Sequence, residues 1–141
     1  MAGYDVIIVG NGPAGLSAAL YTSRANLKTL VIGKDQGALA KAERIENYFG
    51  MAEPVSGCEL VENTKQQAKS LGAALVTDEI FHISWNQGFV LEGREGTYQA
   101  VSVLLATGSS RKKADIKGLA ELEGRGVSYC AICDAFFRGR K

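Results

Sequence analysis

The chain has 141 residues, which is enough for one domain with a hydrophobic core and too few for two domains of ordinary size. Apolar residues make up 46% of it and charged residues 22%, the balance of a folded globular protein rather than a disordered one. Sixteen basic and fifteen acidic residues leave a net charge of +1, so we expect neither a nucleic-acid partner nor a membrane partner.

The first part of the chain predicts a β-strand, an α-helix and a second β-strand. The apolar run 4–10 ends in glycine and is typical of a strand buried on both faces. Residues 13–25 are rich in alanine and leucine and favour a helix, and 29–32 form a second short apolar run. A strand, a helix and a strand within about 30 residues indicate a βαβ unit with a parallel sheet.

A glycine-rich loop joins the first strand to the first helix. Gly10, Gly12 and Gly15 form the pattern G-x-G-x-x-G, which binds the pyrophosphate of a dinucleotide when it follows a strand and opens a helix. Pro13 suits the first helical turn, and Ala14 follows it, where free backbone amides face the phosphates. We therefore predict that these five residues bind a cofactor, and the alternative is a glycine-rich turn without a ligand.

The glycine motif alone does not distinguish NAD from FAD. An acidic residue that binds a ribose hydroxyl is expected after the second strand, but that strand runs into Gly33. Asp35 lies two residues later and is the candidate substitute. Lys34 is an alternative that could face a phosphate instead.

The middle of the chain predicts a second helix and a group of short strands. Ser56 and Glu59 form a capping-box pattern at the start of a helix that Gly72 ends. From 74 to 100 the pattern changes to short β-rich pieces separated by turns, which predicts an antiparallel meander. Residues 101–108 predict a further buried strand, and the charged, glycine-punctuated segment after them predicts a crossover to another domain.

Two cysteines three residues apart, Cys130 and Cys133, lie near the end of the printed sequence. Such a pair can hold half a zinc site or carry electrons as a dithiol. Zinc needs two more ligands, and the only candidates, Cys58 and His82, lie in unrelated elements without ligand spacing. Cys58 is expected to be a small buried residue. The first apolar run is too short for an export signal, so we predict reduced thiols and a cytoplasmic protein.

Four stretches together resemble low-molecular-weight thioredoxin reductases, which are flavin-dependent pyridine nucleotide–disulphide oxidoreductases. They are residues 4–20, "IENYFG" at 45–50, "LLATGS" at 104–109 and "GVSYCAICDAFF" at 126–137. The resemblance implies an α/β fold, in which a Rossmann-type parallel sheet forms an FAD-binding domain with a three-stranded antiparallel β insertion. The start of a second domain would follow. The expected bounds are 1–110 for the amino-terminal part of the FAD-binding domain, 111–126 for a crossover linker and 127–141 for the truncated start of the second domain, which binds the nicotinamide and carries the dithiol.

The resemblance also implies roles for single residues. The three glycines of the loop would hold the FAD pyrophosphate, Asn47 would lie near the flavin ring, and Ala106, Thr107 and Gly108 would form a second turn that contacts FAD. Cys130 and Cys133 match the redox dithiol, with Cys133 nearer the flavin, and Asp134 matches the acid beside it.

The function implied by the resemblance is disulphide reduction. Electrons would pass from NADPH or another reduced donor through FAD and the dithiol to a protein disulphide such as that of thioredoxin. We expect the complete protein to be a homodimer and the isolated 141 residues to be inactive, because the family's nicotinamide domain has barely begun at Lys141. Two departures are the loop at 33–43 and Ala135, where the family usually has glycine. The alternatives are a nucleotide-binding module without turnover and an NAD(P) enzyme whose cysteines are incidental.

Overall fold

The computed structural model describes residues 3–109, 114–122, 125–127 and 129. The chain divides into two compact units, Met1–Ser109 and Ser110–Lys141. Among its described residues the second unit contains one short 3-10 helix, η2 (Ala120–Leu122). The finer domain boundaries at residues 110 and 126 stay predictions.

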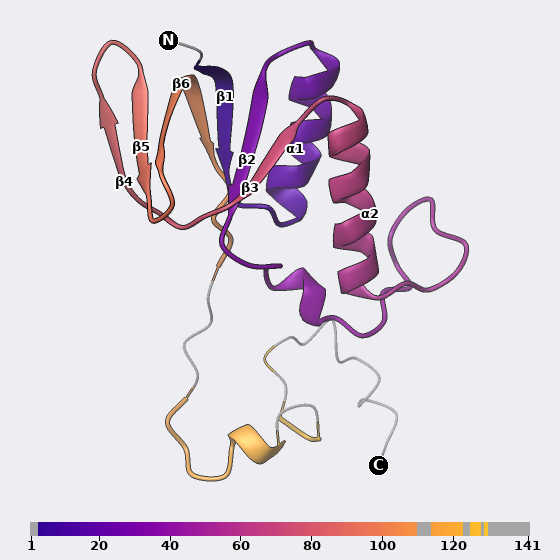
Figure 1. Ribbon diagram of the computed structural model, residues 1–141. Coiled ribbons are helices and arrows are strands. Elements are labelled where there is room, and N and C mark those ends of the chain that lie inside the picture. The colour runs from indigo at the N-terminus through magenta and orange to yellow at the C-terminus, as the bar shows by residue number, and fades with distance from the viewer. Residues whose placement is uncertain (1–2, 110–113, 123–124, 128, 130–141) are drawn as a thin grey trace. The chain divides into compact units, whose positions relative to one another are not determined.

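A mixed six-stranded sheet forms the first unit, with the strand order β3-β2-β1-β6-β5-β4 (Figure 1). Its strands are β1 (Tyr4–Val9), β2 (Thr29–Gly33), β3 (Ala74–Thr77), β4 (Ile80–Trp85), β5 (Phe89–Gly93) and β6 (Thr97–Leu105). β1 pairs in parallel with β2 and β6, and β2 pairs in parallel with β3. β5 pairs antiparallel with both β4 and β6. The predicted α/β fold with a parallel sheet and three antiparallel strands is confirmed.

The extent of the meander was predicted wrongly. Residues 74–77 were expected in it, but they form β3 and run parallel to β2, from Leu30 opposite Ala74 to Gly33 opposite Thr77. Residues 97–105 form one strand rather than two, since β6 pairs with β5 in its first part and with β1 in its second. A short apolar run does not reveal its partner strand, and here the helix before β3 returns the chain to the parallel side.

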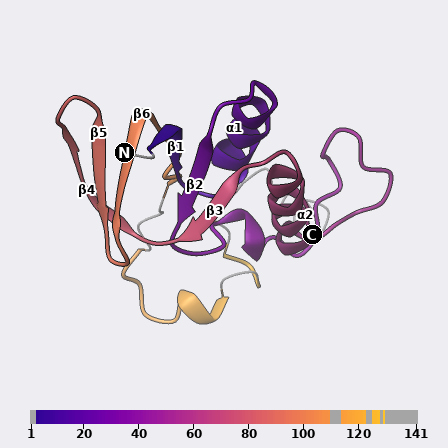
Figure 2. The ribbon, with the colours of Figure 1, turned by 45° about the horizontal axis from the view of Figure 1, so that its top comes forward.

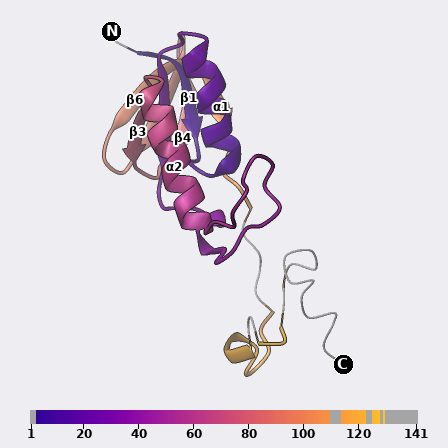
Figure 3. The same cartoon turned by 90° about the vertical axis from the view of Figure 1, so that its right-hand side faces the viewer.

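Two hydrophobic clusters lie on opposite faces of the parallel strands. On one face, helices α1 (Pro13–Arg24) and α2 (Gly57–Ser70) pack against Val6, Ile8 and Val31. On the other face, Ile7, Leu30 and Ile32 pack with Leu91 of β5 and with partly buried residues of β4 and β6. Figure 2 shows the helices on one side of β1–β3 and the β4–β5 hairpin on the other, and Figure 3 shows the helices in front of the sheet. β1 and β2 are therefore buried on both faces, as their apolar runs predict.

Local sequence explains where the two helices begin. Pro13 occupies the first position of α1, where its missing N–H is not needed. At the start of α2 the Ser56 hydroxyl accepts a hydrogen bond of 3.1 Å from the Glu59 amide, which is half of the predicted capping box. Gly72, with a φ of 95°, follows the end of α2 in the conformation that favours glycine.

Ser23 is a buried polar residue whose replacement should change the stability of the fold. It lies in the last turn of α1 and is buried, and its hydroxyl has no hydrogen-bond partner among the described residues. A buried hydroxyl without a partner destabilises the folded state, so Ser23→Ala should raise the free energy of unfolding by about 1 kcal/mol, measured by urea denaturation. Ser17→Ala, at an exposed position of the same helix, is the control for helix propensity. An equal gain in both variants would contradict the prediction.

Asp78 connects the β3–β4 crossover to the β5–β6 turn. Its carboxylate accepts hydrogen bonds from the backbone amides of Glu79 at 2.7 Å, Arg94 at 2.9 Å and Glu95 at 3.2 Å, and from the Tyr98 hydroxyl at 2.8 Å. A side chain at Gly93 would overlap this carboxylate. Burial acts to raise the pKa of Asp78, but the hydrogen bonds from Tyr98 and the three amides outweigh it and leave the pKa lowered. Burial and the bond to Asp78 raise the pKa of Tyr98 to about 12, so its hydroxyl stays a donor at neutral pH.

The lowered pKa of Asp78 predicts a pH dependence of stability. In the unfolded chain the pKa of an aspartate is about 3.9, so the stabilisation is fully present above that pH and is lost as the pH falls through the lower folded value. Asp78→Asn should therefore be less stable than the wild type at pH 7, and the difference should shrink below pH of about 4. Urea denaturation at pH 7, 5 and 3 measures this. The exposed Asp115→Asn serves as control, and a difference for Asp78→Asn that does not change with pH would contradict the prediction.

Candidate functional site

Three loops meet at the carboxyl edge of the parallel strands. β1, β2 and the second part of β6 run in the same direction, so the loops that follow them leave the sheet at one edge. The Gly10 amide donates a hydrogen bond of 2.7 Å to the Ile32 carbonyl, and the Ala106 amide donates one of 2.8 Å to the Val9 carbonyl. The structure thus brings together the loops that begin at Gly10, Lys34 and Ala106.

The three glycines of the first loop lie in different structural environments. Gly10 has a φ of 118°, and a Cβ there would overlap the Ala106 carbonyl. A Cβ at Gly15 would overlap the Gly10 carbonyl, so this glycine allows the helix to pack closely against the strand. A Cβ at Gly12 would have no atom within 4 Å. The fold requires Gly10 and Gly15, whereas the space above Gly12 is left open.

The amino-terminal end of α1 opens onto this space. Gly12 is the N-cap residue and supplies no side-chain hydrogen bond, and the first turn holds no acidic residue. The amides of the first turn therefore have no capping side chain, and the helix dipole adds a partial positive charge. Pro13 and Ala14 are exposed at this end. A glycine with open space above it, beside amides that no side chain caps, can accommodate the pyrophosphate of a dinucleotide.

The second loop lies beside the first. Asp35 is exposed, and its Oδ1 accepts a hydrogen bond of 2.7 Å from the Gly37 amide. A Cβ at Gly37 would lie 3.9 Å from the Gly12 Cα, which places this turn next to the glycine loop. The Lys34 ammonium lies 3.2 Å from the Glu79 carboxylate, and a phosphate contact by Lys34 stays an alternative prediction. Nucleotide binding by Asp35 stays a prediction.

The third loop carries the Ala106–Thr107–Gly108 turn. Ala106 is half-buried against Gly10, while Thr107 and Gly108 are exposed. Asn47 is exposed in the segment between the 3-10 helix η1 (Leu39–Lys41) and α2. No hydrogen bond among the described residues joins the Asn47 side chain to the glycine loop. The turn therefore lies at the site, and the role of Asn47 stays a prediction.

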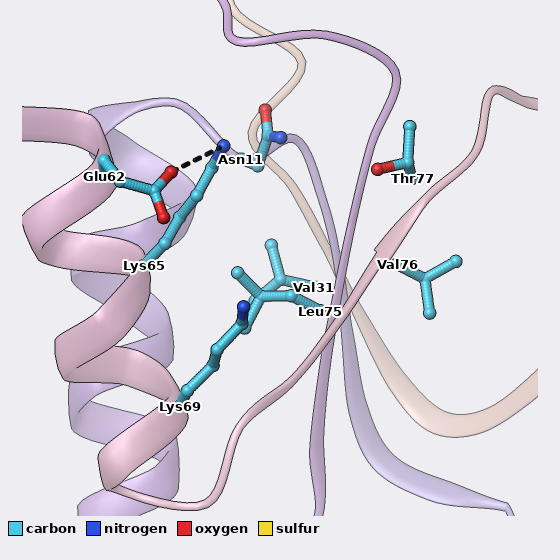
Figure 4. A pocket seen from close by; sticks show the side chains of 8 residues that line it. All are labelled: Asn11, Val31, Glu62, Lys65, Lys69, Leu75, Val76 and Thr77. Atoms are coloured by element: carbon cyan, nitrogen blue, oxygen red, sulfur yellow. Dashed lines mark ion pairs between the residues drawn. The ribbon is translucent and has the colours of Figure 1, made fainter. Parts of the chain in front are cut away.

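A hollow of about 190 Å³ adjoins the glycine loop between α2 and β3 (Figure 4). Asn11 from the loop, Lys65 and Lys69 from α2 and Thr77 from β3 give it polar groups, and Glu62 also lines it. The remaining lining residues are apolar: Val31, Leu75 and Val76. The Lys65 ammonium lies 3.8 Å from the Glu62 carboxylate, and the Lys65 side chain is only 17% exposed.

The polar residues that line this hollow could not be identified from the sequence. A side chain at Gly33 would overlap the Asn11 side-chain amide, so residues 22 positions apart share one place at the end of β2. The signal available in the sequence was the glycine itself, which stands where an acid was expected.

The predicted cysteine site can be placed only in part. Cys130, Cys133 and Asp134 lie outside the described residues. Cys58 was expected to be buried but is exposed, and its Sγ lies 3.9 Å from Gln36 Oε1. The reason is its place in the first turn of α2, where Leu60 and Val61 rather than Cys58 face the core. His82 is exposed on β4.

Metal-binding clusters and membrane-spanning helices are both absent from the described part of the chain. It contains no group of three or more His, Cys, Asp or Glu side chains that could hold a metal ion. Its helices include none that is both long and apolar enough to cross a membrane.

Comparison with known proteins extends over nearly the whole chain. Residues 4–141 match the model of a family described as pyridine nucleotide-disulphide oxidoreductase. A thioredoxin reductase from Treponema pallidum is 50% identical over 141 residues, which cover 97% of this chain and 46% of that protein. One from Aquifex aeolicus is 43% identical over 140 residues, with 95% and 43% covered. The solved structure of a thioredoxin reductase from Gloeobacter violaceus matches with a TM-score of 0.75 and 40% identity, covering 96% of this chain and 44% of that one. The chain spans less than half the length of these relatives.

Proposed function

Because the chain belongs to the pyridine nucleotide-disulphide oxidoreductase family, we propose that its residues form the amino-terminal part of the FAD-binding domain and the redox dithiol of a flavin-dependent disulphide reductase. The open space above Gly12, at an amino-terminal helix end without a capping side chain, is the observation that carries this proposal. The relatives that cover nearly all of the chain are named thioredoxin reductases, which supports a thioredoxin-like protein disulphide as the substrate.

The glycine loop and the first turn of α1 would hold the cofactor. The backbone at Gly12 lets the pyrophosphate approach, and the amides that follow Pro13 and Ala14 donate hydrogen bonds to it. Asn47 and the turn at Ala106–Gly108 are further proposed contacts. Bound FAD would supply the electron transfer between a reduced donor, NADPH or another, and the dithiol.

Cys130, Cys133 and Asp134 would carry out the exchange with the substrate. The Cys130 thiolate attacks one sulfur of the substrate disulphide, forms a mixed disulphide and releases the other sulfur as a thiolate. Cys133 then attacks Cys130, which releases the second substrate sulfur and leaves a Cys130–Cys133 disulphide for the next reduction. Asp134 would transfer the proton that accompanies the change between thiol and thiolate.

A visible absorption spectrum of the purified protein, in the form that its natural reading frame encodes, tests the cofactor. We expect a flavin spectrum, release of FAD on denaturation, and NADPH- or donor-dependent reduction of thioredoxin. A protein that binds flavin but reduces no disulphide would indicate a nucleotide-binding module, and one that binds NAD without flavin would contradict the proposal. We also propose a cytoplasmic homodimer, which sedimentation and fractionation would test.

A further inference from the structure

The end of β2 lacks the acidic residue that usually binds a ribose hydroxyl in dinucleotide-binding folds. Gly33 stands there, is buried, and has no space for a side chain. An ideal Cβ at Gly33 would lie 2.5 Å from Asn11 Oδ1 and would overlap the other atoms of the same amide. A side chain at position 33 would therefore occupy the same space as the Asn11 amide.

The overlap has a specific chemical meaning. An acidic side chain at position 33 would have to pass through the space that the Asn11 amide now occupies. The Asn11 amide belongs to the middle of the glycine loop, which is proposed to bind the pyrophosphate. The amide offers both an acceptor and a donor, whereas a carboxylate offers only acceptors.

We propose that Asn11 takes the place of the missing acid and binds the adenosine ribose of the dinucleotide through its side-chain amide. Oδ1 accepts a hydrogen bond from a ribose hydroxyl, and Nδ2 donates one to a ribose oxygen. This inference rests on the proposed FAD-binding function and adds a residue that determines how the adenosine half is recognised.

Two neighbouring groups have partners within the protein. The Lys34 ammonium pairs with Glu79, and Asp35 Oδ1 accepts a hydrogen bond from the Gly37 amide. None of the hydrogen bonds among the described residues uses the Asn11 amide. Figure 4 shows the amide at the edge of the hollow beside α2.

Competition binding separates a ribose contact from a purely structural role. FAD affinity is measured by flavin fluorescence, and FAD is displaced with ADP or with 2′-deoxy-ADP. If the deoxy form loses one hydrogen bond, the wild type should bind ADP about three- to tenfold more tightly than 2′-deoxy-ADP. Asn11→Ala should remove this preference and should weaken FAD binding by about the same factor. Asn63→Ala, an exposed asparagine on α2, should change neither value.

A double substitution tests the shared place directly. Gly33→Glu alone should weaken FAD binding about tenfold or more, because its side chain overlaps the Asn11 amide. Asn11→Gly combined with Gly33→Glu makes room for the acidic side chain and should restore the affinity for FAD to within about threefold of the wild type. Thermal unfolding of each variant shows whether the fold is intact.

The outcomes separate this inference from the proposed function. A wild type that binds no FAD overturns the proposed function and the inference with it. A wild type that binds FAD but has the same ADP preference as Asn11→Ala overturns only the role of Asn11, as does a double variant no better than Gly33→Glu.

Discussion

Gly12→Val is expected to weaken FAD binding by at least about a hundredfold, because a branched side chain would fill the space through which the pyrophosphate reaches the backbone amides. The fold itself should tolerate the change. Gly12 has a φ of −78°, which any residue adopts, and a Cβ there meets no atom of the protein within 4 Å. The substitution therefore separates ligand binding from folding. FAD that remains after desalting, measured by absorbance, and the thermal unfolding midpoint are the two readouts.

Gly96→Val and Gly10→Ala are the controls for this experiment. Gly96 lies in the β5–β6 turn, and a Cβ there would come no closer than 3.9 Å to Tyr98, so valine should leave FAD binding unchanged. Gly10→Ala should instead lower stability, since it combines a φ of 118° with an overlap on the Ala106 carbonyl. If Gly12→Val keeps its flavin after desalting, the assignment of the glycine loop to the pyrophosphate is wrong.

The glycine loop could be predicted from the sequence because its pattern is local. Gly10, Gly12 and Gly15 lie within one strand–loop–helix turn, although the carbonyl that a side chain at Gly10 would overlap belongs to Ala106. The capping of α2 by Ser56 and its end at Gly72 are local in the same sense. The placement of the loop between β1 and α1 and both ends of α2 were confirmed, and cofactor binding by the loop stays a prediction.

Strand partners could not be predicted in the same way. Residues 74–77 and 80–85 are both short β-rich pieces, yet one runs parallel to β2 and the other antiparallel to β5. The difference comes from where α2 returns the chain, which no local pattern contains. The exposure of Cys58 was missed for a related reason, because the apolar stripe of α2 was read without knowing which side of its first turn faces the sheet.

The proximity of Asn11 and Gly33 could not be predicted from the sequence. The glycine was correctly recognised as a departure from the usual acid, and Asp35 was chosen as its substitute because it was the nearest acid along the chain. The structure places an amide from 22 residues upstream beside Gly33, and nucleotide binding by Asp35 stays a prediction. Spatial neighbours that are distant in sequence become visible only once the parallel pairing of β1 and β2 is known.

Cys133→Ser is expected to lower the reduction of a protein disulphide by at least about a thousandfold, because it removes one of the two sulfurs between which electrons must pass. The cysteine pair stands three residues apart, a spacing that allows a small-loop disulphide and a thiolate of lowered pKa. Reduction of a small artificial acceptor directly by the flavin does not use the dithiol, so it should change by no more than about twofold. Both activities are measured with the same donor, alongside the amount of bound flavin.

Cys58→Ser and Asp134→Asn complete the test of the dithiol. Cys58 is an exposed cysteine on α2, so its replacement should leave both activities unchanged and controls for the general loss of a thiol. Asp134→Asn should slow protein-disulphide reduction about a hundredfold without loss of flavin, because a positioned proton donor contributes about that much. If Cys133→Ser releases zinc or unfolds the protein while turnover in the remaining folded molecules is normal, the cysteine pair is structural. The electrons would then not pass through Cys133, and the proposed role of the cysteine pair as the redox dithiol would have to be abandoned.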